Sequence, residues 1–299
     1  MPLAVYPKCF LRALVVERTM SLDQWIALVL EALEVDGLEF HPGFTPVTRE
    51  ARQQLRRFLA AHGLSAPMMC HAPDFIHREP GRRAREVEGQ RRAIEATAEL
   101  GGTFCRVLSG QWKPDVARED GLAMAADAIG ECMAHARRFG VCLVLENHYK
   151  ASLWEYPEFA QRSEDFLALL GQIPADPCFG VNFDPSNALI AGDDPVTLLE
   201  AVKHRVVTLH ASDRYFAGGS AEDLRKLDRH PRHGYAAFLR HGVIGEGCVD
   251  YDRIFGILRA VGFSGWISVE DGEDPAVGIP NLQASVAFLR RKMAAHGLS

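Results

Sequence analysis

One pattern repeats four times in the second half of the chain: VCLVL (141–145) is followed by Glu146, CFGVNF (178–183) by Asp184, VVTL (206–209) by His210, and WISV (266–269) by Glu270. Each apolar stretch has the length of a strand buried on both faces, as in parallel sheets. In a barrel of parallel strands, side chains at the carboxyl ends meet at one mouth, where barrel enzymes hold their chemistry. Two glutamates, an aspartate and a histidine there predict a site for a divalent metal ion.

Apolar strands and amphipathic helices alternate along the whole chain, and this alternation predicts the α/β class. Besides the four strands above, we expect earlier strands at 10–16, 37–41, 66–71 and 103–108. Helices are expected at 21–33, 48–62, 82–100, 115–139, 157–170, 194–202, 250–261 and 280–296. The units predict a closed (β/α)8 TIM barrel, a single domain over residues 1–299, with a long insertion at about 212–248 after the seventh strand. A doubly wound sheet would need a glycine-rich loop after its first strand, and the sequence has none there.

The composition favours an enzyme that acts on a small molecule. The net charge is −6 and the pI is near 6.1, whereas nucleic-acid-binding domains carry clustered basic residues. Without a signal peptide or an apolar stretch of about eighteen residues, we expect no membrane partner and a cytoplasmic location. The seven cysteines contain no CxxC pair and are interpreted as small core residues in a reducing compartment. The sequence leaves open whether the chain forms a homo-oligomer.

Five short phrases follow one another in the order expected of a known family: LENH (145–148), NFDPSN (182–187), LHASD (209–213), GEGCVDY (245–251) and SVED (268–271). Together they resemble the sugar phosphate isomerase/epimerase family, whose fold is a xylose-isomerase-like TIM barrel, and the resemblance covers essentially the whole chain. It implies a cofactor of one divalent ion, most often manganese, with magnesium, cobalt or zinc as alternatives. The implied ligands are Glu146, Asp184, His210 and Glu270.

The resemblance also implies proton transfer beside the carbonyl of a small carbohydrate. A metal ion bound to adjacent carbonyl and hydroxyl oxygens stabilises the enediolate that forms when the neighbouring C–H bond loses its proton. We expect Glu146 and Glu270 to be the catalytic residues, because they lie on different strands and can approach the sugar from opposite sides. One carboxylate removes the proton. The other returns it on the opposite face, or protonates a leaving group in a β-elimination.

The reaction class therefore stays open between two kinds of enzyme. An isomerase or epimerase is the main expectation, and a metal-dependent lyase or dehydratase of a keto-sugar, inosose or 3-keto-glycoside is the alternative. An AP endonuclease, which also belongs to this superfamily, is disfavoured because Ser109, Gly110 and Asn187 stand where further metal ligands are needed. A binding protein without catalysis would usually have lost one of the four ligands.

Six further residues are candidates for binding the substrate: His71, Trp112, His148, Asn187, Arg214 and Glu246. Asn187 stands where many family members have a histidine, so it can hydrogen-bond a hydroxyl but cannot carry a proton. Trp112 and Arg214 have equally good structural explanations, as a packed loop aromatic and an exposed surface charge. Of Glu39 and His41, after the second strand, one should face the pocket.

Xylose isomerases, which this barrel resembles at a distance, hold two metals and use a hydride shift. Asp213 is the only obvious extra carboxylate for a second metal in this sequence. The sequence therefore favours proton transfer.

Overall fold

The computed structural model describes residues 1–151, 154–226, 238–272 and 274–298. The strands of its central sheet are β1 (Leu3–Val5), β2 (Gly37–Leu38), β3 (Met68–Met69), β4 (Phe104–Val107), β5 (Cys142–Glu146), β6 (Phe179–Phe183), β7 (Val206–Ala211) and β10 (Trp266–Val269). These eight strands lie in the order β2-β1-β10-β7-β6-β5-β4-β3, and every neighbouring pair in the barrel is parallel. The outer strands β2 and β3 meet through isolated parallel bridges, Gly37↔Ser65 and Phe40↔Met69. The predicted TIM barrel is confirmed, nearly closed.

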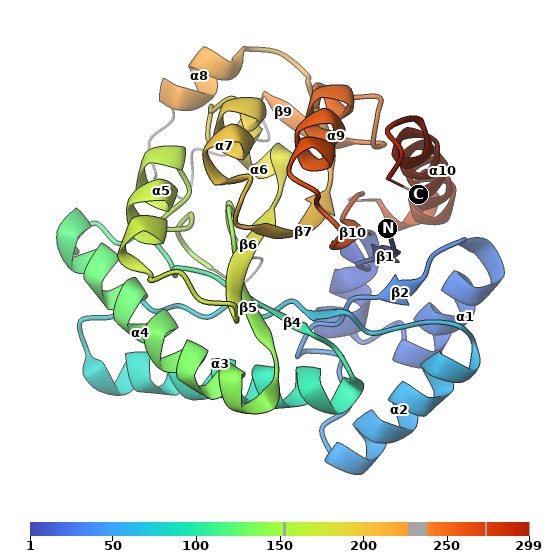
Figure 1. Ribbon diagram of the computed structural model, residues 1–299, viewed down its shortest axis with the longest axis horizontal. Coiled ribbons are helices and arrows are strands. Elements are labelled where there is room, and N and C mark those ends of the chain that lie inside the picture. The colour runs from blue at the N-terminus through green and yellow to red at the C-terminus, as the bar shows by residue number, and fades with distance from the viewer. Residues whose placement is uncertain (152–153, 227–237, 273, 299) are drawn as a thin grey trace.

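Helices surround the strands (Figure 1). Their bounds are α1 (Leu22–Ala32), α2 (Arg49–Ala61), α3 (Pro80–Leu100), α4 (Arg118–Phe139), α5 (Ser163–Gln172), α6 (Pro185–Ile190), α7 (Pro195–Val202), α8 (Ala221–Lys226), α9 (Tyr251–Ala260) and α10 (Gly278–Ala295). All the expected helices are present, although α5 begins later than predicted. The sequence analysis missed α6 and α8, which have only six residues each and show no helical period.

Side-chain caps fix where several helices begin. Ser21 accepts a hydrogen bond from the backbone of Gln24, whose side chain accepts one from the backbone of Ser21, and this capping box starts α1. Thr48, Asp194 and Asp250 cap α2, α7 and α9 in the simpler way, each accepting from a backbone N–H three residues ahead. These helix starts were predictable because the caps are local in sequence.

The expected first strand at 10–16 is wrong. Residues there belong to a 3-10 helix, η1 (Lys8–Phe10), and to a π-helix, η2 (Ala13–Glu17), while the first barrel strand is β1. The reason is the spacing of buried side chains, because Phe10 and Leu14 are both buried and lie four residues apart, as on a helix. Strand β1, with three residues, is too short to stand out in a sequence.

The insertion after β7 carries β8 (Asp213–Phe216), α8 and β9 (Leu239–Gly242). Strands β8 and β9 pair antiparallel as a separate ribbon beside the barrel. Residues 227–237 of the predicted insertion lie outside the described residues. The described part is therefore more regular than its sequence suggested.

All seven cysteines are free, as expected, but they are not uniformly core residues. Cys142 and Cys178 are half-buried and Cys248 is exposed, whereas the other four are buried. Among the helices of the described residues, none combines the length and apolarity needed to cross a membrane.

Candidate active site

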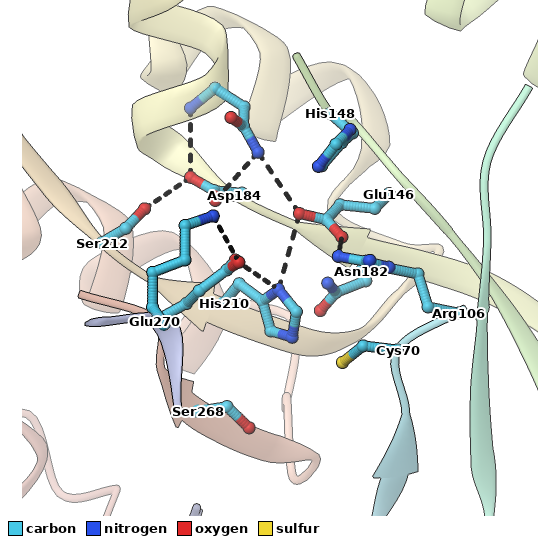
Figure 2. A network of polar contacts seen from close by, with 12 residues as sticks. Cys70, Arg106, Glu146, His148, Asn182, Asp184, His210, Ser212, Ser268 and Glu270 are labelled. Atoms are coloured by element: carbon cyan, nitrogen blue, oxygen red, sulfur yellow. Dashed lines mark hydrogen bonds and ion pairs between the residues drawn. The ribbon is translucent and has the colours of Figure 1, made fainter. Parts of the chain in front are cut away.

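Three side chains meet in the barrel mouth because their strands are parallel and end at the same side: Glu146 ends β5, His210 lies near the end of β7, and Glu270 follows β10. His210 Nδ1 lies 3.5 Å from Glu146 Oε1 and 2.9 Å from Glu270 Oε2. Both carboxylates point at the same edge of the imidazole (Figure 2). One ligand atom of each residue lies within 4.8 Å of the other two, and all three residues are buried. The arrangement gathers two oxygens and one nitrogen around a single point.

Asp184, the fourth predicted ligand, lies beside this group with its oxygens already engaged. Its Oδ1 accepts hydrogen bonds from the backbone of Ser186 at 2.7 Å and of Asn187 at 3.1 Å, and from Ser212 Oγ at 2.7 Å. Asn187 Nδ2 donates to Asp184 Oδ2 at 2.9 Å and to Glu146 Oε1 at 3.3 Å. The side-chain amide of Asn187 thus joins Asp184 to the cluster.

Two cations hold the glutamates in their ionised form. Arg106 Nη1 lies 2.9 Å from Glu146 Oε2, and Lys8 Nζ lies 3.0 Å from Glu270 Oε1. Burial alone would raise the pKa of Glu146, but the charges of Arg106 and then His210 outweigh it and lower the pKa to about 2. Burial acts in the same direction on Glu270, where Lys8 and His210 lower the pKa well below its ordinary value. Both carboxylates are therefore anionic at neutral pH.

The crowded carboxylates raise the pKa values of two neighbouring groups. Burial, and then the negative charges of Glu270 and Glu146, raise the pKa of Asp184 to about 6. For His210, burial favours the neutral ring, but the carboxylates around it, Glu39 foremost, raise its pKa well above the ordinary value. Negative charge is thus in excess around His210, and a cation would relieve it.

The donors present fit a divalent cation. His210 Nδ1 is buried and makes no hydrogen bond to any described residue, although two carboxylate oxygens lie close to it. A histidine that binds an ion is neutral, and the four carboxylates around His210 would then exceed the two cations by two charges, which a divalent ion would offset. The charged side chains in that balance are Glu39, Glu146, Asp184 and Glu270 against Lys8 and Arg106.

A cavity of about 750 Å³ opens over the half of the mouth formed by the first strands of the barrel. Its polar lining includes Lys8, which contacts Glu270, and the imidazoles of His41 and His71. Val15 and Val16 of η2 contribute to an apolar wall. The four proposed metal ligands are not among the residues that line this cavity, and Lys8 is the lining residue that contacts one of them, Glu270.

Three of the predicted substrate-binding residues lie at or near this mouth. His71 lines the cavity, and its Nε2 is directed at Gly89 of α3. His148 is buried with Nδ1 3.2 Å from Glu158 Oε2, and it lies close to Glu146 (Figure 2). Asn187 contacts two of the predicted metal ligands, as described above. A role for these residues in binding substrate stays a prediction.

The other three have different surroundings, and only Arg214 adjoins the cluster, through Ser186 next to Asp184. Trp112 packs edge-on against Tyr156, with ring centroids 5.7 Å apart. Arg214 is buried on β8, where its Nε donates to Ser186 Oγ at 3.4 Å and its Nη2 lies 2.7 Å from His241 Nε2. Of its two interpretations, that of an exposed surface charge is therefore wrong, and a role in binding substrate stays a prediction. Glu246 is exposed on the segment after β9.

Asp213 was considered as a ligand of a second metal, but its carboxylate accepts hydrogen bonds from the backbone. Its carboxylate accepts N–H groups of Arg214 at 2.8 Å, Gly245 at 2.9 Å, Gly247 at 3.1 Å and Val249 at 3.0 Å. Each oxygen of Asp213 accepts two of these backbone N–H groups, so neither oxygen has capacity left for an ion, whereas Asp184 Oδ2 accepts, among the described residues, only from the side chain of Asn187. It orders the chain that follows β9.

The sequence analysis missed several polar neighbours of the cluster. Arg106 did leave a signal, because it is a charged residue within the apolar strand FCRV. Lys8 left none, since it lies next to the segment that was mistaken for a strand. Glu158, which accepts hydrogen bonds from the backbone and hydroxyl of Ser109 at 2.8 Å each, was assigned to the helix expected at 157–170 but lies before α5, in the loop that follows β5.

Comparisons with curated proteins find enzymes. The inosose dehydratase of Clostridium beijerinckii (strain ATCC 51743 / NCIMB 8052) is 24% identical over 210 residues, which cover 69% of this chain and 63% of that protein. The inosose dehydratase of Geobacillus kaustophilus (strain HTA426) is 32% identical over 108 residues, which cover 35% of this chain and 33% of that protein. The chain thus spans less than two thirds of the length of these relatives.

Solved structures share the fold at low identity. The IOLI protein with a bound zinc atom superimposes with a TM-score of 0.75 at 16% identity, over 99% of each chain. A D-tagatose 3-epimerase-like protein does so with a TM-score of 0.73 at 19% identity, over 99% of this chain and 98% of the other. The model of the xylose isomerase-like TIM barrel family matches residues 27–292. This chain belongs to the family of xylose isomerase-like TIM barrels.

Proposed function

We propose that this protein is a divalent-metal-dependent isomerase or epimerase that abstracts a proton next to the carbonyl of a small sugar or keto-sugar. The observation that carries the proposal is the convergence of Glu146 and Glu270 on His210 Nδ1. The two glutamates come from β5 and β10, which are separated in the barrel by β6 and β7. Two ionised carboxylates can thus reach one substrate from different directions.

The proposed ligands of the ion are Glu146, Asp184, His210 and Glu270. When bound, a divalent ion would act as a Lewis acid on the oxygens of the substrate. Manganese is our first expectation, because carboxylate oxygens with one imidazole suit it well. The bound zinc named for the IOLI structure supports a divalent metal in general.

The chain's own residues supply the proton transfers. Glu146, kept anionic by Arg106, is a base that can accept the proton from the carbon beside the carbonyl. Glu270 serves the opposite face, and the ammonium group of Lys8 places a proton donor directly beside it. Asn187 holds Glu146 in place and can donate to a substrate hydroxyl. We further propose that His71 and His148 contribute hydrogen bonds from the walls of the mouth.

A lyase reaction is the second candidate, and two observations favour it. The curated relatives named above are inosose dehydratases, which are lyases. Asn187 also stands where many family members have an imidazole, so the proton-return half of an epimerisation has one carrier fewer. In a β-elimination, the first carboxylate removes the proton as before, and the departing hydroxyl or glycosyl oxygen takes a proton from the ammonium group of Lys8, passed on through Glu270.

Metal analysis of purified protein tests the site itself. We expect one divalent ion per chain in the wild type, and loss of it in the double variant Glu146→Gln, Glu270→Gln. The matched control exchanges two exposed glutamates, Glu17→Gln and Glu200→Gln, and should keep its metal. Undiminished metal in the first variant would contradict the proposed ligands.

Product analysis in deuterated water tests the reaction. The manganese-loaded protein is incubated separately with free ketoses, a 3-keto-glucoside and an inosose, and products are followed by NMR. Deuterium at an inverted or isomerised carbon supports the isomerase or epimerase, whereas loss of water or of a glycosyl group assigns the lyase. A product formed at full rate without solvent deuterium would exclude the two-carboxylate mechanism in favour of a hydride shift.

A further inference from the structure

A third carboxylate, that of Glu39, contacts His210 on the side of the ring that faces away from Glu146 and Glu270. Glu39 Oε2 is 2.9 Å from His210 Nε2. The two ring nitrogens of His210 therefore have different surroundings. Nδ1 faces the proposed metal ligands, and Nε2 faces a carboxylate that takes no part in the proposed reaction.

Glu39 is held firmly in this position. It follows β2, is only 1% exposed, and its Oε1 accepts a hydrogen bond from Ser268 Oγ of β10. Its Oε2 also accepts from Cys70 Sγ at 3.2 Å, so four barrel segments meet at one carboxylate. Figure 2 shows Cys70 and Ser268 on the far side of the His210 ring from Glu146 and Glu270. Burying a carboxylate costs several kcal/mol unless its partners compensate, and the contacts with Ser268, Cys70 and His210 supply that compensation.

We propose that Glu39 is a positioning residue for His210, accepting the Nε2–H of the ring and thereby presenting the Nδ1 lone pair to a metal ion. This inference rests on the proposed function. A histidine that binds a metal needs its other nitrogen protonated and hydrogen-bonded, and a carboxylate in that place fixes the ring orientation and makes the ligand more basic. Residues in this role typically change metal affinity 10- to 100-fold when replaced.

The same residues allow a different interpretation, in which Glu39, Cys70 and His210 form a second metal site. Their donor atoms lie within 4.8 Å of one another. However, both oxygens of Glu39 already accept hydrogen bonds, from Ser268 and from Cys70, in addition to the contact with His210. An ion there would have to displace these donors in the barrel interior. The hydrogen-bonded arrangement fits the positioning role directly.

The test measures metal affinity, with Mn²⁺ titrated calorimetrically into metal-free protein and Co²⁺ absorption as an independent signature of the ligand field. We expect Glu39→Gln to bind Mn²⁺ 10- to 100-fold more weakly than the wild type with unchanged stoichiometry, because the amide keeps the shape but not the charge. We also expect an altered Co²⁺ spectrum. Excess metal should restore most of the turnover of Glu39→Gln, which a folding defect would not permit. Ser268→Ala removes the hydroxyl donor to Glu39 and should weaken Mn²⁺ binding several-fold. It replaces Glu39→Gln as the test variant if Glu39→Gln does not fold.

Cys70→Ala is the matched control, since it removes only a weak thiol donor to Glu39 and leaves the stronger hydroxyl donor, Ser268, in place. Its affinity should stay within about threefold of the wild type. Equal affinity of Glu39→Gln and wild type would overturn the positioning role, and so would two ions in the wild type with one lost in Cys70→Ala. Wild-type protein that binds no divalent ion would contradict the proposed function instead, so the two failures are distinguishable.

Discussion

Buried charges in the mouth of this barrel are paired across neighbouring segments. Arg106 points from β4 to Glu146 on β5, and Lys8 reaches Glu270 from η1. Such pairs do little for net stability, but an unpaired member is expensive. Their value here is that each glutamate is kept as an anion in an interior that would otherwise protonate it.

Removing Arg106 should therefore destabilise the fold strongly. In Arg106→Met, Glu146 loses its buried partner and the carbonyl of His71 loses the donor Nε, which lies 3.1 Å away. We expect the free energy of unfolding in urea, without added metal, to fall by about 3–5 kcal/mol. Arg12→Met, which breaks the exposed pair with Glu17, should cost less than about 1 kcal/mol. Equal, small effects of both variants would show that the Arg106 pair is not effectively buried.

Lys8 should set the pH at which the site loses its ion. Because Lys8 lowers the pKa of Glu270, Lys8→Met should raise that pKa, and Glu270 will then take up a proton at a higher pH. We expect the affinity for Mn²⁺ to decline at higher pH during acidification in Lys8→Met than in the wild type. Lys8→Arg, which keeps the charge, should follow the wild type. Superimposable pH profiles of Lys8→Met and wild type would refute this coupling.

These residue-scale features differ in how far the sequence reveals them. Glu146, His210 and Glu270 could be placed together because each ends a predicted strand and parallel strands end at one side. The contact between Glu39 and His210 could not, since it depends on barrel closure and on which way a residue just after a two-residue strand points. For Asp184, the position at the end of a strand was predicted from the sequence, but its hydrogen bonds with Ser212 and Asn187 were not.

At the scale of elements, the insertion is organised by one side chain. Asp213 at the start of β8 binds backbone groups of the segment that follows β9, and a Cβ on Gly247 would lie 2.2 Å from its Oδ1. The ribbon of β8 and β9 is thereby tied to the chain that leads into α9. The sequence showed how long this insertion is but not that it has a regular structure. The hydrogen bonds that organise it join a side chain to the backbone, and such bonds leave no periodic pattern in the sequence.

Asp213→Ala should loosen this segment without unfolding the barrel. Hydrogen bonds to a charged acceptor contribute about 1.5–3 kcal/mol each. We expect hydrogen exchange of the amides at 245, 247 and 249 to accelerate at least about tenfold, while exchange in β5 and β6 stays near the wild-type rate. Asp223→Ala removes a carboxylate from exposed α8 in the same insertion and should leave these amides unchanged. Unaltered exchange in Asp213→Ala would mean that other contacts order the segment.

At the scale of the element, η2 also explains why one strand was misplaced. Its apolar residues serve both the core, through Leu14, and the wall of the cavity, through Val15 and Val16. A segment with apolar side chains on several faces has no clear period, and length alone favoured a strand. The other barrel strands were found because each is a short apolar run bounded by turn residues.

On the scale of the whole molecule, the barrel buries histidines as well as carboxylates, so its stability must depend on pH. Burial, with the nearby charges of His41 and Arg106, lowers the pKa of His71 from 6.5 to about 3. The folded protein therefore keeps this ring neutral between pH 3 and pH 6.5, while the unfolded chain protonates it. Because the unfolded state binds more protons there, this group makes the fold less stable as the pH falls through that window. Asp184 and Asp271, whose pKa values are raised to about 6, act in the opposite direction between that pH and their unfolded values.

A comparison of His71→Gln with the wild type separates these effects, since both proteins share the two aspartates. From about pH 6.5 downward, the variant should gain stability relative to the wild type by up to about 1.4 kcal/mol per pH unit. Above pH 7 the difference between the two should become constant, because His71 is then neutral in both the folded and the unfolded state. Urea unfolding at half-unit intervals from pH 4.5 to pH 8 measures this difference directly. A difference that does not change with pH would mean that the His71 ring, which lines the cavity, takes up a proton as readily in the folded protein as in the unfolded chain.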